Sequence, residues 1–426
     1  MAVQKPTRIR FVVLAALFGL AAFTYLDRVC MSIAAPWITR DLKLSPEEMG
    51  TLFSVFAAAY ALFGMPTGWC GDRLGPRRML SFVLGWWSIF TAAIGFVGSF
   101  TSMLTVQFLF GAGEAGAYPN MTRSVTAWFP PRGRGFAMGT VWMGSRLGAA
   151  ITPPIVLFLI HLLGWRETFR ILGISGGLLA VAWFVLFRDH PSELPCVNAA
   201  ERELIAQKDA ALPALRHEPV PLGRILLSKN LWALDLMYFT LGFTYYLYIS
   251  WLPSYLVKRH GVSLHQLAFY AALPLAFSAA AALMGGVVTD SLVPYTGLKW
   301  ARRAVGMAGS AAAATCLFIS LHLNDVRGAV LFISLAAAAG DFVLAAAWAS
   351  CADIGESAAG TVSGAMNMIG NVGATASPIL MGFLIERTGN WNLTFYIAAA
   401  LNLAGLVFWL GIDAGRKLLR ESAAPA

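Results

Sequence analysis

Residues 11–36, FVVLAALFGLAAFTYLDRVCMSIAAP, form an apolar run that is interrupted by two adjacent charges, Asp27 and Arg28. A membrane-spanning helix needs about 20 mostly apolar residues, so this run can cross a bilayer. Its length and the lack of a convincing cleavage site predict a retained helix rather than a signal peptide. A charge in hydrocarbon costs at least about 2.5 kcal/mol, so Asp27 and Arg28 indicate a function inside the membrane.

The rest of the chain has the same character. Of 426 residues, 58% are hydrophobic and 12% are charged, whereas a soluble domain carries about 25% charged residues. Backbone groups in lipid must be satisfied within the segment, so the spans are helices and the fold is all-α. Twelve spans are predicted, at 11–36, 49–69, 79–98, 102–125, 135–160, 169–187, 231–256, 267–288, 303–322, 328–349, 359–385 and 392–412.

Charge distribution sets the expected topology. With the N-terminus inside, the inner segments carry 20 of the 31 Lys and Arg residues and the outer loops carry 8. This bias predicts both termini in the cytoplasm and a multi-pass protein of the cell (inner) membrane. It also explains the net charge of +9 without nucleic acid. The five cysteines are scattered, so no metal, cofactor or disulfide framework is expected.

The spans divide into two halves. We expect a six-helix bundle at 1–190, a Pro-rich cytoplasmic linker at 191–228 and a second bundle at 229–426. Within the linker, Asn198 followed by Glu201 is typical of a helix N-cap with its capping-box acid, which predicts a short helix through about residue 208.

The halves repeat two motifs. Gly68-x-x-x-Asp72 recurs as Gly286-x-x-x-Asp290, and Gly148-Ala149-x-x-x-Pro153 recurs as Gly373-Ala374-x-x-x-Pro378. Such ordered recurrence indicates a duplicated six-helix unit. Parallel repeats of this kind predict a central site between the two halves.

The segment GWCGDRLGPRR, residues 68–78, resembles the loop 2–3 signature of the major facilitator superfamily. Within that superfamily, the chain resembles the anion:cation symporters. That resemblance rests on YLDR at 25–28, GEA at 113–115 with YP at 118–119, GAMN at 364–367 and GNVG at 370–373. It implies twelve transmembrane helices in two six-helix bundles related by pseudo-twofold symmetry. The chain departs from some relatives at Gln107, where they place an arginine, and at Arg146.

Three charged residues form the predicted centre. Arg28 suits bidentate capture of a carboxylate; the alternative is a structural pair with Asp27 or Glu114. Desolvation favours a neutral carboxyl, so Glu114 could exchange a proton with solvent; the alternative is a permanently ionised partner of an arginine. Asp27 is either a second proton site or the group that orients Arg28.

Further candidates line the expected cavity. Arg146 would suit a substrate with two acidic groups or a phosphate, although a snorkelling or helix-paired arginine is an equal alternative. Asn367 and Asn371 lie four residues apart on one helix face and could bind hydroxyl groups or join helices. The resemblance adds Tyr25 and Tyr60, and the aromatic character of their helices adds Tyr245 and Trp348. Asp341 is an intramembrane acid whose role stays open.

The loop after the second span carries a candidate gate. By the resemblance, Asp72 with Arg73, Arg77 and Arg78 forms an acid–base network on the inner side, and Arg123 joins it. Positive-inside charge alone would explain the bases, but neither the glycines nor Asp72.

These features predict a secondary active transporter that carries a small organic anion, such as a sugar acid, with protons by alternating access. Its expected partners are that anion, protons and the lipid bilayer, and we expect a monomer. The alternatives are a phosphate or organophosphate antiporter and a transporter-like membrane sensor. An enzyme is not expected, because the sequence shows no nucleophile–base pair, metal cluster or phosphate-binding glycine loop.

Overall fold

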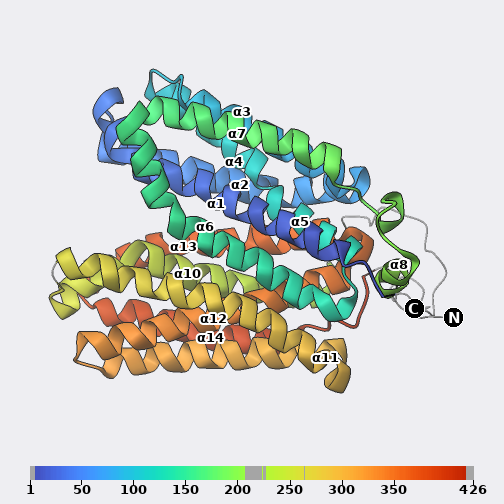
Figure 1. Cartoon of the computed structure of the whole chain (residues 1–426). Coiled ribbons are helices and arrows are strands. Elements are labelled where there is room, and N and C mark those ends of the chain that lie inside the picture. The colour runs from blue at the N-terminus through green and yellow to red at the C-terminus, as the bar shows by residue number, and fades with distance from the viewer. Residues whose placement is uncertain (1–4, 207–222, 224–226, 263, 419–426) are drawn as a thin grey trace. The chain divides into compact units, whose positions relative to one another are not determined.

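The computed structural model describes residues 5–206, 223, 227–262 and 264–418. Its described elements are helical, and the predicted all-α class is confirmed (Figure 1). The chain separates into two compact units. Unit 1 comprises Met1–Pro131, Leu147–Pro219 and Gly355–Gly364, and unit 2 comprises Arg132–Arg146, Val220–Ile354 and Ala365–Ala426.

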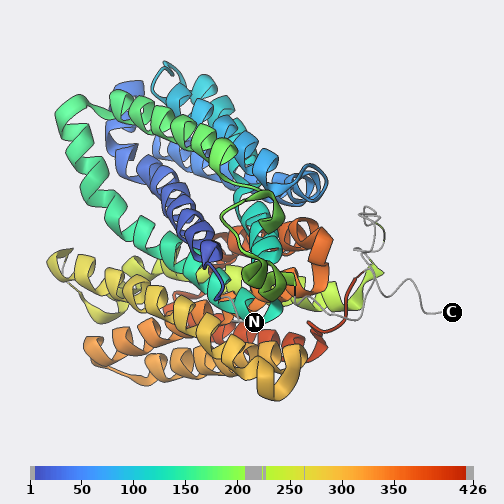
Figure 2. The same ribbon diagram turned by 45° about the vertical axis from the view of Figure 1, so that its right-hand side comes forward.

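Unit 1 is built from α1 (Ile9–Leu42), α2 (Pro46–Leu74), α3 (Pro76–Ile94), α4 (Phe100–Glu114), α5 (Ala117–Trp128), the second half of α6 (Arg134–Leu163), α7 (Trp165–Leu186) and α8 (Ala199–Ala206). In this unit α3 packs along α7 and α2 packs along α4 (Figure 2). Short 3-10 turns stand at Pro131–Gly133, Pro191–Glu193 and Glu356–Ala358.

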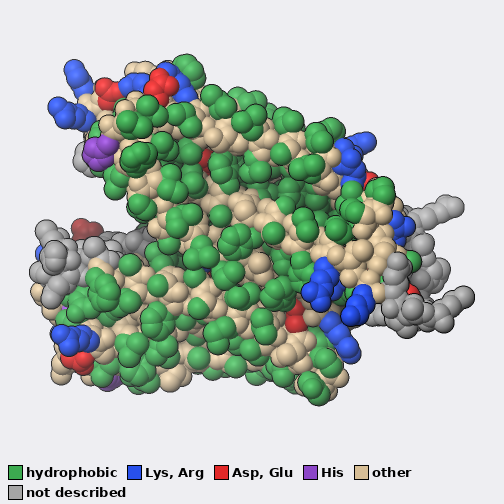
Figure 3. Space-filling view, viewed as in Figure 1, with side chains coloured by type: hydrophobic (Ala, Val, Ile, Leu, Met, Phe, Trp, Pro, Cys, Tyr) green, Lys and Arg blue, Asp and Glu red, His purple; other side chains and the backbone are tan. Residues whose placement is uncertain are grey.

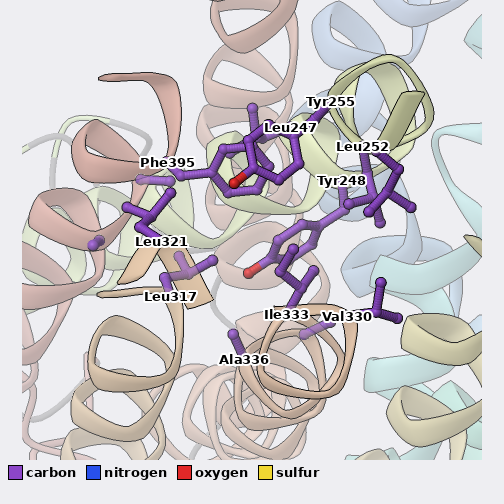
Figure 4. Close-up of a cluster of buried hydrophobic side chains, with 14 of the residues drawn as sticks. Leu247, Tyr248, Leu252, Tyr255, Leu317, Leu321, Val330, Ile333, Ala336 and Phe395 are labelled. Carbon is purple, nitrogen blue, oxygen red and sulfur yellow. The ribbon is translucent and has the colours of Figure 1, made fainter. Parts of the chain in front are cut away.

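Unit 2 is built from the first half of α6 and from α10 (Lys229–His260), α11 (Leu264–His322), α12 (Val326–Gly355), most of α13 (Ala359–Thr388) and α14 (Trp391–Gly411). Here α14 packs against α10 and α11. A buried cluster that includes Leu247, Tyr248, Tyr255 and Phe395 joins α10 to α14 (Figure 4).

One predicted span differs from the structure. The expected helix at 102–125 is interrupted after Glu114, since Pro119 lacks a backbone N–H and its ring crowds the carbonyl four residues earlier. The expected helices at 267–288 and 303–322 lie on either side of a kink in α11, so they remain two helices as predicted. Within α11 the turn is made by Gly297, whose φ of 73° suits glycine alone.

The helix surfaces match a lipid environment. Seven segments of the described chain are long and apolar enough to cross a membrane; two of them, Ala272–His322 and Val326–Thr388, each contain two predicted spans. The remaining predicted spans correspond to α3, to the interrupted α4 and α5, and to α10. In the view of Figure 3, hydrophobic side chains cover the lengths of the helices, and charged side chains gather at their ends.

Candidate functional site

A buried ion pair in unit 1 joins α1 to the end of α4. Arg28 donates from Nε and Nη2 to Oε1 of Glu114, at 3.1 Å and 2.7 Å. The Glu114 carboxylate is 1% exposed, and its other oxygen, Oε2, has no hydrogen-bond partner among the described residues. Both donors of the guanidinium edge therefore converge on one oxygen.

Aromatic rings surround this guanidinium. Its carbon lies 5.2 Å from the ring centroid of Tyr25, 5.4 Å from that of Phe56 and 4.6 Å from that of Tyr60. At such distances the ring faces attract the cation, and more strongly where water is excluded. The Arg28 side chain is still 23% exposed, so the rings and Glu114 do not cover it completely.

Asp27 is buried beside this pair but takes no part in it. Its side chain is 3% exposed, and both carboxylate oxygens lack a hydrogen-bond partner in the described part of the chain. Glu114 is its charged neighbour. The indole N–H of Trp87 faces it, yet completes no hydrogen bond. Adjacent helix positions point about 100° apart, which explains why Arg28 reaches Glu114 instead.

A second ion pair lies in unit 2, between α6 and α12. Arg146 donates two hydrogen bonds to the Asp341 carboxylate, from Nε to Oδ2 at 3.0 Å and from Nη2 to Oδ1 at 2.6 Å. Its Nη1 donates to the hydroxyl oxygen of Tyr245 at 2.8 Å. Arg146 and Asp341 are each 5% exposed. The partner of Asp341, which the sequence left open, is Arg146.

The remaining candidates of unit 2 make other contacts. The ring of Trp348 is tilted by 58° against that of Trp142, with ring centroids 5.4 Å apart, and its indole N–H donates to the hydroxyl of Tyr238 at 3.0 Å. Asn371 donates to the backbone oxygen of Asn367 at 2.7 Å on the same helix, α13.

Asp72 caps the start of α13, where Gly360 lies 288 residues further along the chain. Its carboxylate accepts three hydrogen bonds: from the backbone N–H of Gly360 at 2.9 Å, from the backbone N–H of Thr361 at 2.7 Å and from the hydroxyl of Thr361 at 2.5 Å. A carboxylate stabilises the unpaired N–H groups and partial positive charge at a helix start. Arg123 lies 3.6 Å from Asp72, and a Cβ at Gly68 would strike the carbonyl of Gly360.

Asp290 does the same for α6 in unit 2. It accepts the backbone N–H groups of Gly135 at 3.0 Å and Phe136 at 2.6 Å, while Arg302 binds it at 2.8 Å. A Cβ at Gly286 would strike the carbonyl of Gly135. The repeated Gly-x-x-x-Asp motif thus performs one task twice: the glycine admits a helix start and the aspartate caps it.

Sequence reasoning missed the charges around Asp353. This fully buried carboxylate on α12 binds Arg134 at 2.8 Å and Arg302 at 3.1 Å, and its backbone oxygen accepts from Lys417 at 2.9 Å. Recurrence of the motif at Asp290 was the one signal that pointed here.

The other predicted gate residues, Arg73, Arg77 and Arg78, form no hydrogen bond or ion pair with Asp72 in the described part of the chain and lie in different surroundings. Arg73 lies over the ring of Trp69 on its own helix, and Arg78 is exposed. The backbone N–H of Arg77 donates to Asp189 at 2.7 Å, and its side chain donates to the carbonyl of Phe184. Burial raises the pKa of Asp189, and the bond from Arg77 partly offsets that rise.

Comparison with known proteins identifies the fold. A family model described as the Major Facilitator Superfamily matches residues 17–378. The chain belongs to the major facilitator superfamily. The crystal structure of the superfamily transporter FucP in the outward conformation has a TM-score of 0.71 at 16% identity, covers 94% of this chain and 98% of FucP, and supports the fold.

Two superfamily relatives align over nearly the whole chain. The probable sulfoacetate transporter SauU of Cupriavidus necator is 35% identical over 413 residues, which cover 96% of this chain and 95% of SauU. The probable L-galactonate transporter of Escherichia coli K12 is 31% identical over 421 residues, covering 96% and 91%. The predicted resemblance is confirmed, and this superfamily member is a multi-pass membrane transporter rather than an enzyme. The roles of individual residues stay predictions.

Proposed function

We propose that this chain carries a small organic anion together with protons, by alternating access. The observation that carries the proposal is the pairing of Arg28 with a single oxygen of Glu114 inside an aromatic cage that is partly open. The printed names of the relatives, a sulfoacetate and an L-galactonate transporter, support organic anions as the substrate class.

In the proposed cycle, Glu114 is the internal counter-ion of Arg28. When Glu114 takes up a proton, it becomes neutral and Arg28 loses that counter-ion. The substrate carboxylate then binds the Nε and Nη2 edge of the guanidinium, which suits a two-point contact. When the proton leaves, Glu114 competes for the same edge and releases the anion, which couples proton and substrate movement.

Asp27 is the second proton-coupling residue in this proposal. An ionised carboxylate without hydrogen-bond partners in a membrane interior costs several kcal/mol, so this buried group suits a cycle in which it holds a proton. Tyr25 and Tyr60 contribute ring faces to the substrate site, and we propose that Trp348, Asn367 and Asn371 contribute from the other half of the sequence.

The capped helix starts act as the gate. We propose that the contacts of Asp72 with α13 and of Asp290 with α6 form when one side of the transporter closes and break when it opens. Arg123 supports the first contact, and Arg73, Arg77 and Arg78 set the charge of the surrounding loop. The positive-inside bias supports a cytoplasmic location for this loop and both termini, in an inner membrane.

Uptake into proteoliposomes tests the proposal. Purified protein is reconstituted at neutral internal pH, labelled galactonate is supplied at acidic or neutral external pH, and initial rates are compared. We expect an inward proton gradient to drive accumulation, and Arg28→Ala to reduce uptake at least about thirtyfold, since truncating a buried charge partner costs about 2–5 kcal/mol. Arg28→Lys keeps the charge but not the fork, and should recover uptake only in part.

Arg40→Ala is the matched control, because Arg40 is an exposed arginine on the same helix, α1. It should transport like the wild type. Normal galactonate uptake by Arg28→Ala, or accumulation that ignores the proton gradient, would overturn the proposal. Exchange of phosphate without protons would support the antiporter alternative instead.

A further inference from the structure

Unit 2 contains a cavity at the corner where α10 ends and α12 begins. The cavity has a volume of about 310 Å³, and its lining includes His260, Tyr270, Asp325 and Arg327, which all belong to unit 2. Sites for small molecules have volumes of about 300–1,000 Å³, so this cavity has room for one small solute.

The imidazole of His260 supplies a hydrogen-bonding atom that the fold does not use. Its Nε2 atom is buried and has no hydrogen-bond partner among the described residues. The ring stands edge-on to Tyr255, a member of the buried cluster in Figure 4, with centroids 5.5 Å apart. The last carbonyl groups of α10 already accept from the backbone N–H groups of Gly261 and Val262, at 3.1 Å and 3.2 Å, so the imidazole is not their cap. Because buried polar atoms are nearly always hydrogen-bonded, Nε2 is suited to a ligand.

The charges at the cavity favour an anion. Arg327 lines it, is exposed, and forms no ion pair within the described part of the chain. The acid in the lining, Asp325, is occupied, because its Oδ2 accepts the backbone N–H of Gly328 at 2.6 Å. Two more exposed bases, Lys258 and Arg259, lie in the last turn of α10. A cavity bordered by one sign of charge raises the local concentration of the opposite ion.

Helix stability explains only part of this charge. Bases stabilise the C-terminus of a helix, which accounts for Lys258 and Arg259 at the end of α10. Arg327 is the second residue of α12, where the positive end of the helix dipole disfavours a base. Its place beside the cavity is therefore better explained by a negatively charged ligand.

His260 also couples the cavity to protons. It lies beyond the predicted span at 231–256, and burial together with the charge of Arg259 lowers its pKa, which the backbone oxygen of Asn324 and the carboxylate of Asp325 partly offset. The other ionisable groups around it are Tyr255 of α10, with Tyr396 of α14 beside it, Tyr270 of α11 and Arg327 of α12. The free ring is therefore neutral near pH 7, and an anion in the cavity would favour its protonated form.

We infer that this cavity is a second anion site, in which a small carboxylate accepts hydrogen bonds from protonated His260 and from Arg327. The inference rests on the proposed function, from which it takes the class of anion. The positive-inside bias predicts that this corner of unit 2 lies on the outer side of the membrane. Acid outside the membrane then loads the site with anion and proton together, on the side from which uptake starts.

Titration of His260 by NMR tests the site. The full chain is labelled with carbon-13 histidine, the His260 signal is assigned by its loss in His260→Gln, and its pKa is measured with and without galactonate. We expect galactonate to bind the protonated ring at least about tenfold more tightly than the neutral ring, so the pKa of His260 should rise when galactonate is present. Arg327→Gln should abolish this rise.

Lys258→Gln is the matched control, because it removes an exposed base from the same corner without changing a residue that lines the cavity. It should keep the rise in the pKa of His260. Thermal unfolding confirms that each variant folds.

Uptake into proteoliposomes provides a second readout. At acidic external pH, His260→Gln and Arg327→Gln should each raise the KM for galactonate at least about threefold and leave the maximal rate unchanged, because they weaken capture of the anion and not its transport. At neutral external pH the ring is neutral in the wild type, so the difference between wild type and His260→Gln should disappear.

Arg28→Ala separates the two proposals, because it removes the proposed substrate contact in unit 1 and leaves the cavity of unit 2 intact. If wild-type protein does not accumulate galactonate with a proton gradient, the proposed function fails, while the pKa of His260 still tests the cavity. If galactonate leaves that pKa unchanged in the wild type, or raises it equally in Arg327→Gln, the cavity is not an anion site. Loss of the rise in Arg28→Ala would also overturn the inference, since the response would then come from the other unit.

Discussion

At the scale of single residues, Glu114 is the group on which proton coupling depends. Glu114→Gln keeps the shape of the side chain but stays neutral, so Arg28 permanently lacks its internal counter-ion. We expect the variant to bind and exchange galactonate across the membrane but to lose accumulation driven by a proton gradient. Counterflow between preloaded and external galactonate measures the first property, and gradient-driven uptake measures the second.

Accumulation by Glu114→Gln at the wild-type rate would contradict this role. A comparison with Asp27→Asn then divides the coupling between the two acids. Because Asp27 completes no hydrogen bond to Arg28, its replacement should reduce gradient-driven uptake without weakening exchange.

At the scale of helices, four of the described helices begin on carboxylates from distant parts of the chain, among them α3, whose Arg77 N–H donates to Asp189. Besides α13 and α6, α1 begins on Glu201 of α8, which accepts from the hydroxyl of Thr7 at 2.5 Å and from the backbone N–H groups of Ile9 at 2.9 Å and Arg10 at 3.2 Å. Asn198 caps α8 as predicted. The expected return bond to Glu201 is absent from the described residues, because the Asn198 N–H donates to Thr7 and the Glu201 carboxylate accepts from the start of α1.

This contact predicts a stability effect. Glu201→Gln removes the charge from a fully buried group with several donors, so the free energy of unfolding should fall by about 1–3 kcal/mol. Thermal unfolding in detergent measures the change. Glu203→Gln, an exposed glutamate on the same helix, should leave the midpoint unchanged; equal midpoints for both variants would refute the importance of the cap.

At the scale of the whole molecule, two helices are divided between the units. The beginning of α13 belongs to unit 1 and the rest of it to unit 2, whereas the beginning of α6 belongs to unit 2 and the rest of it to unit 1. Gly68 and Gly286 make the contacts at these helix starts possible, since any side chain there would strike a backbone carbonyl. Gly68→Leu and Gly286→Leu should each lower galactonate uptake roughly tenfold, because overpacking at a contact that must close costs about 1–3 kcal/mol.

Gly50→Leu on α2 is the control for this prediction, because nothing lies within 4 Å of an added Cβ at that position. It should transport normally. Wild-type uptake by Gly68→Leu, with the protein folded, would show that the close approach of α2 to the start of α13 is not part of the cycle.

Much of the fold was predictable from local patterns. Length and hydropathy of the apolar runs determine that the chain is a bundle of membrane helices, because a helix in lipid satisfies its backbone within the segment. Charges inside those runs marked Asp27, Arg28, Glu114, Arg146 and Asp341, since each costs energy that apolar residues would not. The repeated Gly-x-x-x-Asp motif indicated that both halves contain the same structural feature, but it did not reveal that this feature is a capped helix start.

Only the tertiary structure decided the pairing of those charges. Arg28 and Glu114 lie 86 residues apart, Arg146 and Asp341 195, and Asp72 caps a helix start 288 residues away. Periodicity in a sequence reports which face of a helix a residue occupies, within three or four positions, and carries no information about the helix opposite. Which acid pairs with which arginine depends on how the helices pack, and the proposed chemistry follows from those pairs.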